Sequence, residues 1–236
     1  MYQVNILHLI DGAKQAEGLT VIIDVFRAFS LECYLYDMGV KEIRPVETID
    51  EAFSLGSRIP NSVLIGERGG KKCDGFDYGN SPSTISKERV TGKTIIHTTS
   101  AGTQGVVNAV GASEIITGSL VNAKAVAEYI MAKEPEVVSL VCMGNGGIRP
   151  AAEDELCAEY IKSILEGKEI PDFEERVLDL RYTGGEHFFD KFMQEIFPEA
   201  DFWMCVKYNL FPFVIRVERD GLGLSTRKED VTDLSI

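Results

Sequence analysis

The chain has 236 residues, of which 44% are hydrophobic and 26% are charged. These values are ordinary for a globular protein, and the length suits one large domain or two small lobes. The formal net charge of −13 repels the phosphates of nucleic acids and anionic membrane surfaces, so we expect neither as a partner. No apolar stretch approaches the roughly 20 residues that a membrane-spanning helix needs.

The opening sequence and the cysteines indicate a reducing compartment. The start, MYQVNILHLIDG, lacks the basic residues and the small-residue cleavage site of a secretory signal. The cysteines are five in number, widely scattered, and none forms a C-x-x-C pair. We therefore expect a cytoplasmic protein with neither a disulfide framework nor a zinc site.

Short apolar runs alternate with amphipathic stretches along most of the chain. The runs predict strands at residues 19–25, 41–46, 62–66, 93–98, 114–117 and 137–143. The amphipathic stretches predict helices at residues 28–38, 49–55, 102–110, 123–132 and 152–165. Alternating strands and helices predict a three-layer α/β/α fold with a mostly parallel or mixed sheet.

The C-terminal third is less regular than the rest. Its strongest elements are a predicted helix near residues 185–196 and a predicted strand at 211–218. We expect one domain over residues 1–236, with a core at about 1–167 and a C-terminal part at 168–236. A division into two lobes is compatible with this pattern.

Acidic residues and arginines follow several predicted strands, where α/β proteins bind their ligands. Asp24 and Arg27 follow one buried strand, and Glu67 and Arg68 follow another. Asp24 and Arg27 have a simpler interpretation as a helix N-cap and a surface arginine, and Glu67 and Arg68 as part of a mobile surface loop. The acids of the first turn of the helix at 152–165 complete an oxygen-rich set that suits Mg²⁺, although they also favour the helix dipole. That set is Asp24, Glu67, Glu153 and Asp154.

Glycine-rich and hydroxyl-rich loops also follow the predicted strands. Such loops can bind an anion through backbone N–H groups at a helix N-terminus, or they can simply cap the helix or remain mobile at the surface. The glycine spacing matches neither a dinucleotide fingerprint nor a P-loop. The candidate substrate-binding residues are Asn80, Ser81, Thr98, Thr99, Gly102, Thr103, Ser119, Asn122, Gly144 and Gly146.

Two other functions fit parts of the sequence. Cys142 and Arg149 could serve a cysteine-dependent phosphatase, but six residues separate them where such enzymes have five. A non-catalytic module that binds a small organic acid is the second, although carboxylates without a metal repel anions.

His97 lies within an apolar strand, where a buried and bonded histidine is more common than a base.

These segments, in this order, resemble the 2-phosphosulfolactate phosphatase (ComB) family. The matching stretches are VIIDVFRA at 21–28, GERGGKKCDGFDYGNSP at 66–82, TTSAGT at 98–103, GSLVNA at 118–123 and EDELCA at 153–158. The resemblance covers residues 20–167 well and the C-terminal part more loosely. The long stretch at 66–82 is the most specific of the five.

The resemblance implies a magnesium-dependent hydrolase that converts 2-phosphosulfolactate to sulfolactate and phosphate, a step that leads toward coenzyme M in methanogens. Asp24, Glu67, Glu153 and Asp154 would hold Mg²⁺, and Arg27 and Arg68 would bind the anionic phosphate ester. The nucleophile is either water held by the metal or Asp24, although the second aspartate of haloacid-dehalogenase-type phosphatases is absent, since position 26 is Phe. A homodimer is compatible with the resemblance.

Overall fold

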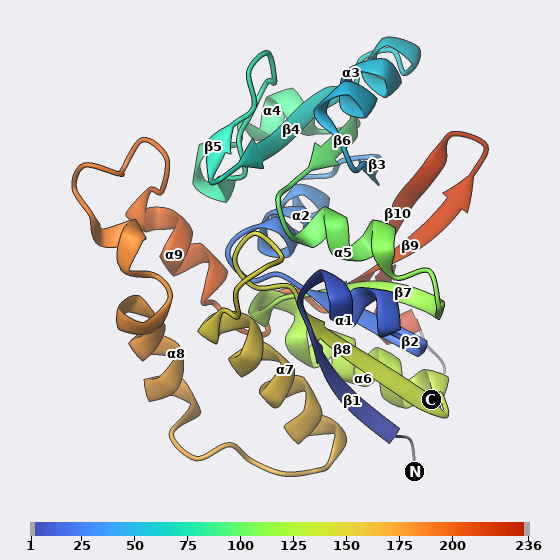
Figure 1. The fold of residues 1–236 in the computed structure, drawn as a ribbon, viewed down its shortest axis with the longest axis vertical. Helices are drawn as coiled ribbons and strands as arrows, with labels where there is room; N and C mark the ends of the chain where they lie inside the picture. Colours follow the sequence, from blue (N-terminus) through green and yellow to red (C-terminus); the bar gives the residue numbers. More distant parts are fainter. Residues whose placement is uncertain (1–2, 234–236) are drawn as a thin grey trace.

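The computed structural model describes residues 3–233 and has three layers, with a mixed β-sheet between two layers of helices (Figure 1). The sheet has the strand order β1-β8-β2-β7-β9-β10-β3-β6-β4-β5. The strands are β1 (Gln3–His8), β2 (Gly18–Ile23), β3 (Glu42–Pro45), β4 (Val63–Arg68), β5 (Lys71–Lys72), β6 (Thr94–Thr98), β7 (Ala112–Gly118), β8 (Val137–Cys142), β9 (Phe213–Asp220) and β10 (Gly223–Asp230). The three-layer α/β/α prediction is therefore confirmed.

Two parallel groups of strands form the halves of this sheet. In one half β1, β8, β2 and β7 pair in parallel, and in the other half β3, β6 and β4 do so. The antiparallel hairpin β9–β10 lies between them and pairs with β7 on one side and β3 on the other. The C-terminal part of the chain thus supplies the middle of the sheet.

Helices cover both faces of the sheet because its central strands are apolar on both sides. In β2, Val21 and Ile23 pack with the helices at Ala123–Lys133 and Ala152–Leu165, whereas Ile22 packs with those at Leu9–Gln15 and Gly102–Asn108 on the opposite face. The helices are α1 (Leu9–Gln15), α2 (Ala28–Asp37), α3 (Ile49–Arg58), α4 (Lys87–Val90), α5 (Gly102–Asn108), α6 (Ala123–Lys133), α7 (Ala152–Leu165), α8 (Phe173–Thr183) and α9 (Glu199–Cys205). The six predicted strands of the first two thirds correspond to β2, β3, β4, β6, β7 and β8.

The C-terminal prediction was partly wrong. Residues 185–196 form a 3₁₀ turn at Glu186–Phe189 and further turns rather than a helix. The apolar spacing there reflects aromatic packing, because Phe188 is buried against the rings of Phe26 and Phe197. The predicted strand at 211–218 corresponds to β9, while β1, β5 and β10 were not predicted.

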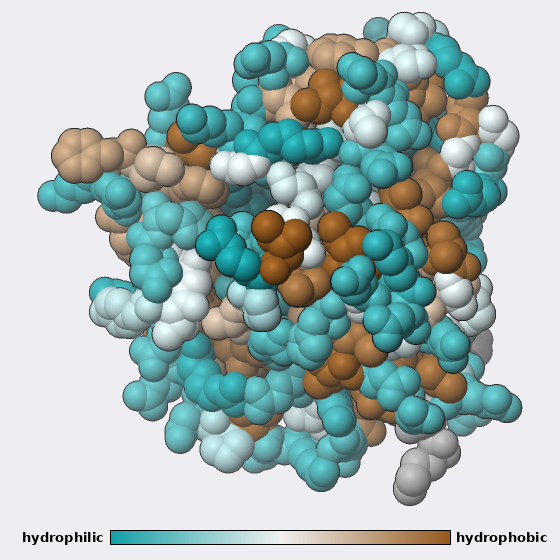
Figure 2. Space-filling view, in the orientation of Figure 1, coloured by the Kyte–Doolittle hydropathy of each residue, from teal (hydrophilic) through white to brown (hydrophobic). Residues whose placement is uncertain are grey.

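The face of the molecule shown in Figure 2 is mostly hydrophilic, in keeping with the net charge of −13. Among the residues that the structure describes, no helix is both long enough and apolar enough to cross a membrane.

Candidate active site

A cavity of about 410 Å³ opens at the carboxyl ends of β2, β4 and β8. The start of α7 and residues that follow α8 complete its walls. Its acidic lining residues are Asp24, Glu67, Glu153 and Asp154. The structure therefore gathers in one cavity the four acids that the sequence singled out from three separate segments.

Asp24 lies at the point where β2 ends and the chain turns toward α2. Its side chain is buried, and Oδ1 accepts a hydrogen bond from the backbone N–H of Ala28 at 3.1 Å. Burial first, and then the negative charge of Glu67, raise the pKa of Asp24 to about 6, although the Ala28 N–H opposes that shift. A Cβ atom on Gly102 would lie 2.8 Å from Oδ2 of Asp24, so only glycine lets α5 approach this closely.

Glu67 is held at the end of β4 by the TTSAGT loop. Its Oε1 accepts the N–H of Ser100 at 2.7 Å, and its Oε2 accepts the N–H of Gly70 at 2.7 Å. The Ser100 hydroxyl donates a further hydrogen bond to Oε2 at 3.2 Å. These donors fix the carboxylate of Glu67 against the cavity.

The adjacent acids Glu153 and Asp154 have different surroundings. Asp154 accepts the N–H groups of Val25 and Gly144 at 2.8 and 2.7 Å, which joins the loops after β2 and β8. Burial first, and then the charges of Asp24 and Glu153, raise the pKa of Asp154 well above its ordinary value. By contrast, Oε2 of Glu153 is buried without a hydrogen-bond partner among the described residues.

The surroundings of this unpartnered oxygen change the pKa of Glu153. Burial first, and then the charge of Asp24, raise the pKa of Glu153 to about 7. A buried carboxylate oxygen without a donor is costly unless the acid is protonated or a cation approaches it. Carboxylate oxygens such as those of Asp24, Glu67 and Glu153 are the ligand type that a hard divalent cation such as Mg²⁺ takes, although no three residues of the cavity bring ligand oxygens within 4.8 Å of one another in the described part of the chain.

Arg27 lines the same cavity, but its guanidinium is already engaged by the protein. Nη1 donates to Oδ2 of Asp201 at 2.7 Å and to the carbonyl of Ile196 at 2.9 Å, and Nη2 donates to the carbonyl of Gly70 at 3.3 Å. The guanidinium also lies over the ring of Phe197, 4.8 Å from its centroid. Arg27 thus ties the C-terminal part of the chain to the loop after β4, and its contact with substrate stays a prediction.

Arg68 points away from the cavity. Its guanidinium donates to the carbonyls of Glu67 and Glu47 and to Oγ1 of Thr98. It lines a neighbouring surface hollow with Ser100 and Gln104. A substrate in the acidic cavity therefore does not meet the side chain of Arg68 in this conformation.

The candidate substrate-binding residues divide into two groups. Asn80, Gly144 and Gly146 line the cavity. The others take part in internal hydrogen bonds or packing nearby: Thr103 binds Thr99, and Ser119 and Asn122 form a capping box after β7. The remaining members of this second group are Ser81, Thr98 and Gly102.

Asn80 is oriented by two buried residues behind it. Nε2 of His97 donates to Oδ1 of Asn80 at 3.1 Å, and Nδ1 of His97 lies 2.8 Å from Oε1 of Glu32. Glu32 and His97 are fully buried. With Oδ1 facing His97, the Nδ2 group of Asn80 is the donor that remains for a ligand.

The cavity also contains His187 and Phe197, which the sequence did not reveal, and Ser100 and Asn145, which lie in loops that the sequence singled out but were not named as site residues. Ser100 lies inside the TTSAGT segment, so its position after β6 was a usable signal. His187 follows the glycine pair at 184–185, and burial together with Arg27 lowers its pKa below the ordinary value. Gly184 itself is needed there, because a Cβ atom would lie within 2.4 Å of Oε2 of Glu153.

The fold and this cavity together define an α/β protein whose ligand site is acidic and lies at the carboxyl edge of the sheet. The model of the 2-phosphosulpholactate phosphatase family matches residues 5–220. The chain belongs to that family, whose description names an enzyme that hydrolyses phosphoric monoesters.

Individual relatives agree with the family match. A probable 2-phosphosulfolactate phosphatase of Bacillus subtilis is 34% identical over 206 residues, which covers 86% of this chain and 88% of that protein. One from Caldicellulosiruptor saccharolyticus is 43% identical over 155 residues, 63% of each chain. One from Carboxydothermus hydrogenoformans is 40% identical over 164 residues, 69% of this chain and 67% of that protein.

Proposed function

We propose that this protein is a Mg²⁺-dependent phosphatase that hydrolyses 2-phosphosulfolactate, or a closely related phosphorylated hydroxy acid, to the hydroxy acid and inorganic phosphate. The observation that carries this proposal is the buried, unpartnered Oε2 of Glu153, a residue that lines the cavity together with Asp24 and Glu67. Family membership supports the reaction, and the volume of about 410 Å³ suits a small ligand.

Charge balance supports the requirement for a metal ion. The cavity has four acidic residues, its arginine Arg27 is paired with Asp201, and the pKa of His187 is lowered. A phosphate ester that also carries a sulfonate and a carboxylate would be repelled by such a lining. When bound, Mg²⁺ would offset this charge and stabilise the charge that develops on the transferred phosphoryl group.

The residues of the chain have separate parts in this proposal. Asp24, Glu67 and Glu153 would hold the ion, and Asp154 would keep the loops after β2 and β8 in place. Asn80 would donate its Nδ2 hydrogens to an anionic oxygen of the substrate. Phe26 and Phe197 provide apolar wall that reduces the access of bulk water.

We propose water as the nucleophile and phosphorus as the atom attacked. The bond between phosphorus and the ester oxygen breaks, and the hydroxy acid leaves with a proton on that oxygen. A covalent phosphate on Asp24 is the alternative. Quenching a single turnover and treating the protein with hydroxylamine distinguishes the two routes, because only the covalent route leaves an acyl phosphate on Asp24, which hydroxylamine converts to a hydroxamate with release of phosphate.

A cysteine-dependent reaction has less support from the geometry. Burial first, and then the carboxylates of Asp154 and Glu155, raise the pKa of the Cys142 thiol far above its ordinary value. Cys142 is also buried and does not line the cavity. A thiol in that state is a poor nucleophile.

Phosphate release from a panel of small phosphate monoesters tests the proposal. The panel contains 2-phosphosulfolactate, 2-phospholactate and 2-phosphoglycerate, each assayed with Mg²⁺, with EDTA, and with EDTA followed by excess Mg²⁺. We expect activity that EDTA abolishes and Mg²⁺ restores. Activity that resists EDTA but is lost on thiol alkylation would favour Cys142, and binding without turnover would favour a non-catalytic module.

A further inference from the structure

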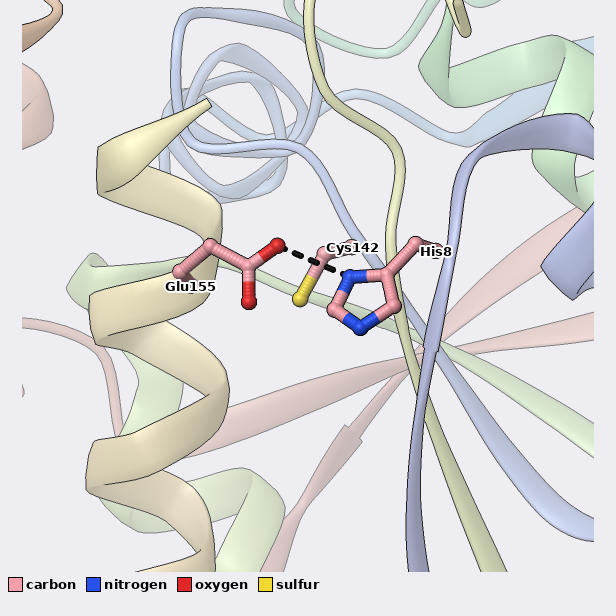
Figure 3. Close-up of side chains that lie close together, drawn as sticks. All are labelled: His8, Cys142 and Glu155. Atoms are coloured by element: carbon pink, nitrogen blue, oxygen red, sulfur yellow. Dashed lines mark hydrogen bonds and ion pairs between the residues drawn. The ribbon is translucent and has the colours of Figure 1, made fainter. Parts of the chain in front are cut away.

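A second cluster of potential ligands lies outside the acidic cavity. Although the spacing of the cysteines predicts no zinc site, strand pairing brings together residues that are far apart in the sequence, and we propose that His8, Cys142 and Glu155 form a binding site for a divalent cation of the zinc class. One ligand atom from each residue lies within 4.8 Å of the other two (Figure 3). None of the three lines the acidic cavity, so this inference is independent of the proposed phosphatase reaction.

The fold places these three side chains together with little freedom. His8 ends β1 and Cys142 ends β8, and the two residues are direct partners in the parallel strand register. Glu155 lies in the first turn of α7. The neighbouring Asp154 fixes that turn, since its carboxylate accepts the Gly144 N–H at 2.7 Å and its carbonyl accepts the Cys142 S–H at 3.5 Å.

The ligand types distinguish this cluster from the acidic cavity. Imidazole nitrogen, thiolate sulfur and carboxylate oxygen are the ligands that Zn²⁺ takes, whereas Mg²⁺ takes oxygen ligands. Sites with three protein ligands leave a fourth position for water or another molecule. An ion bound at about 2.0–2.3 Å from each atom fits the cluster after a small inward movement of the side chains.

The cluster is open to solvent on one side. The side chains of His8 and Glu155 are 49% and 39% exposed, while Cys142 is buried at the base. Nδ1 of His8 already lies 2.8 Å from Oε1 of Glu155, so both groups point toward the same space (Figure 3). An ion can therefore enter from the surface and displace this hydrogen bond, and the thiol proton leaves as the Cys142 sulfur binds.

Cobalt substitution tests the site, because Co²⁺ bound by a thiolate gives a sulfur-to-metal charge-transfer band in the near ultraviolet. The full-length protein is prepared without a histidine tag, stripped with EDTA and titrated with Co²⁺ in the presence of excess Mg²⁺. We expect this band to saturate at one equivalent and to disappear when one equivalent of Zn²⁺ is added. Absence of the band under these conditions, or a band that one equivalent of Zn²⁺ leaves unchanged, would overturn the proposal.

Variants tie the band to the cluster. We expect Cys142→Ala to lose the band, and His8→Gln and Glu155→Gln to weaken Zn²⁺ binding by more than about tenfold. The two exposed positions keep the test informative if the buried cysteine variant folds poorly. Cys73→Ser and Asp24→Asn are the matched controls, since neither residue belongs to the cluster, and both should keep the band. A band that survives in Cys142→Ala, or tight Zn²⁺ binding in His8→Gln, contradicts the assignment.

Discussion

Nη1 of Arg27 lies 2.7 Å from Oδ2 of Asp201, and these side chains, 174 positions apart in the sequence, are 3% and 0% exposed. Asp201 also accepts hydrogen bonds at Oδ1 from the Ser81 hydroxyl and the Ser83 N–H, at 3.0 and 2.9 Å. One buried ion pair therefore holds α9, the turn after β2 and the segment after the GERGG loop at the edge of the cavity.

Loss of this ion pair should destabilise the protein. Arg27→Ala should lower the free energy of unfolding by about 3–5 kcal/mol, because it leaves Asp201 charged and buried without its partner. Arg27→Lys should have a smaller effect, since it keeps the charge but loses the planar hydrogen-bond geometry. Urea denaturation followed by circular dichroism measures both. Arg68→Lys is the control and should change stability by less than about 1 kcal/mol; equal effects at both arginines would contradict the assignment.

The raised pKa of Glu153 predicts how the stability of the metal-free protein depends on pH. The pKa is about 7 in the folded chain and 4.5 as its ordinary value, so folding favours the protonated acid. The contribution of Glu153 is fully present below pH 4.5, and it is lost as the pH rises through the folded pKa near 7.

Glu153→Gln removes this titration. At pH 8 with EDTA, the variant should be more stable than wild type by roughly 2–3 kcal/mol. The difference should shrink toward zero as the pH falls below 5, and urea denaturation across this pH range measures it. Added Mg²⁺ should stabilise wild type more than the variant. A difference in stability that is the same at all pH values would show that the pKa of Glu153 is not raised by folding.

The buried pair behind Asn80 predicts a loss of substrate binding at a distance. His97→Gln should raise KM by about five- to tenfold, since the Asn80 amide is then free to turn its oxygen toward the anionic substrate. The value of kcat should change less than KM. In the Asn80→Ala background the same change should have little further effect, because the two residues act through one contact. Additive losses in that double variant would argue against the positioning role of His97.

Gly102 is predicted to be essential to the position of Asp24. Gly102→Ala would place a methyl group 2.8 Å from Oδ2 of Asp24 and 2.9 Å from Cβ of Ala28. We expect kcat/KM to fall by about a hundredfold while stability falls by only about 1–3 kcal/mol. Gly221→Ala is the control, because nothing lies within 4 Å of its added methyl group. Equal activity in the two variants would exclude the tight approach of α5 to Asp24.

The sequence was informative where function depends on the ends of strands. Asp24 and Glu67 follow apolar runs, and parallel strands place their carboxyl ends on one edge, so their meeting was predictable. The contacts of other residues that line the cavity could not be predicted in this way. Arg27 meets Asp201 only because α9 folds back across the molecule, and Asn80 meets His97 only through the arrangement of the loop after β4.

The central strand β10 was equally difficult to predict from the sequence. The strand β10 has polar residues at many positions, such as Arg227 and Glu229, so its sequence has no clear apolar pattern. It is a central strand because β9 and β3 pair with its two edges. Long-range pairing of this kind leaves no local periodicity from which a prediction could start.

The most direct test of the account is the Mg²⁺ dependence of kcat/KM for 2-phosphosulfolactate in wild type and in Asp24→Asn. We predict that wild-type activity rises with Mg²⁺ to saturation and vanishes in EDTA. Asp24→Asn should reduce kcat/KM by at least about a hundredfold at every Mg²⁺ concentration while the protein remains folded. Wild-type turnover that persists in EDTA, or an Asp24→Asn variant as active as wild type, would contradict the assignment of this cavity as a magnesium-dependent active site.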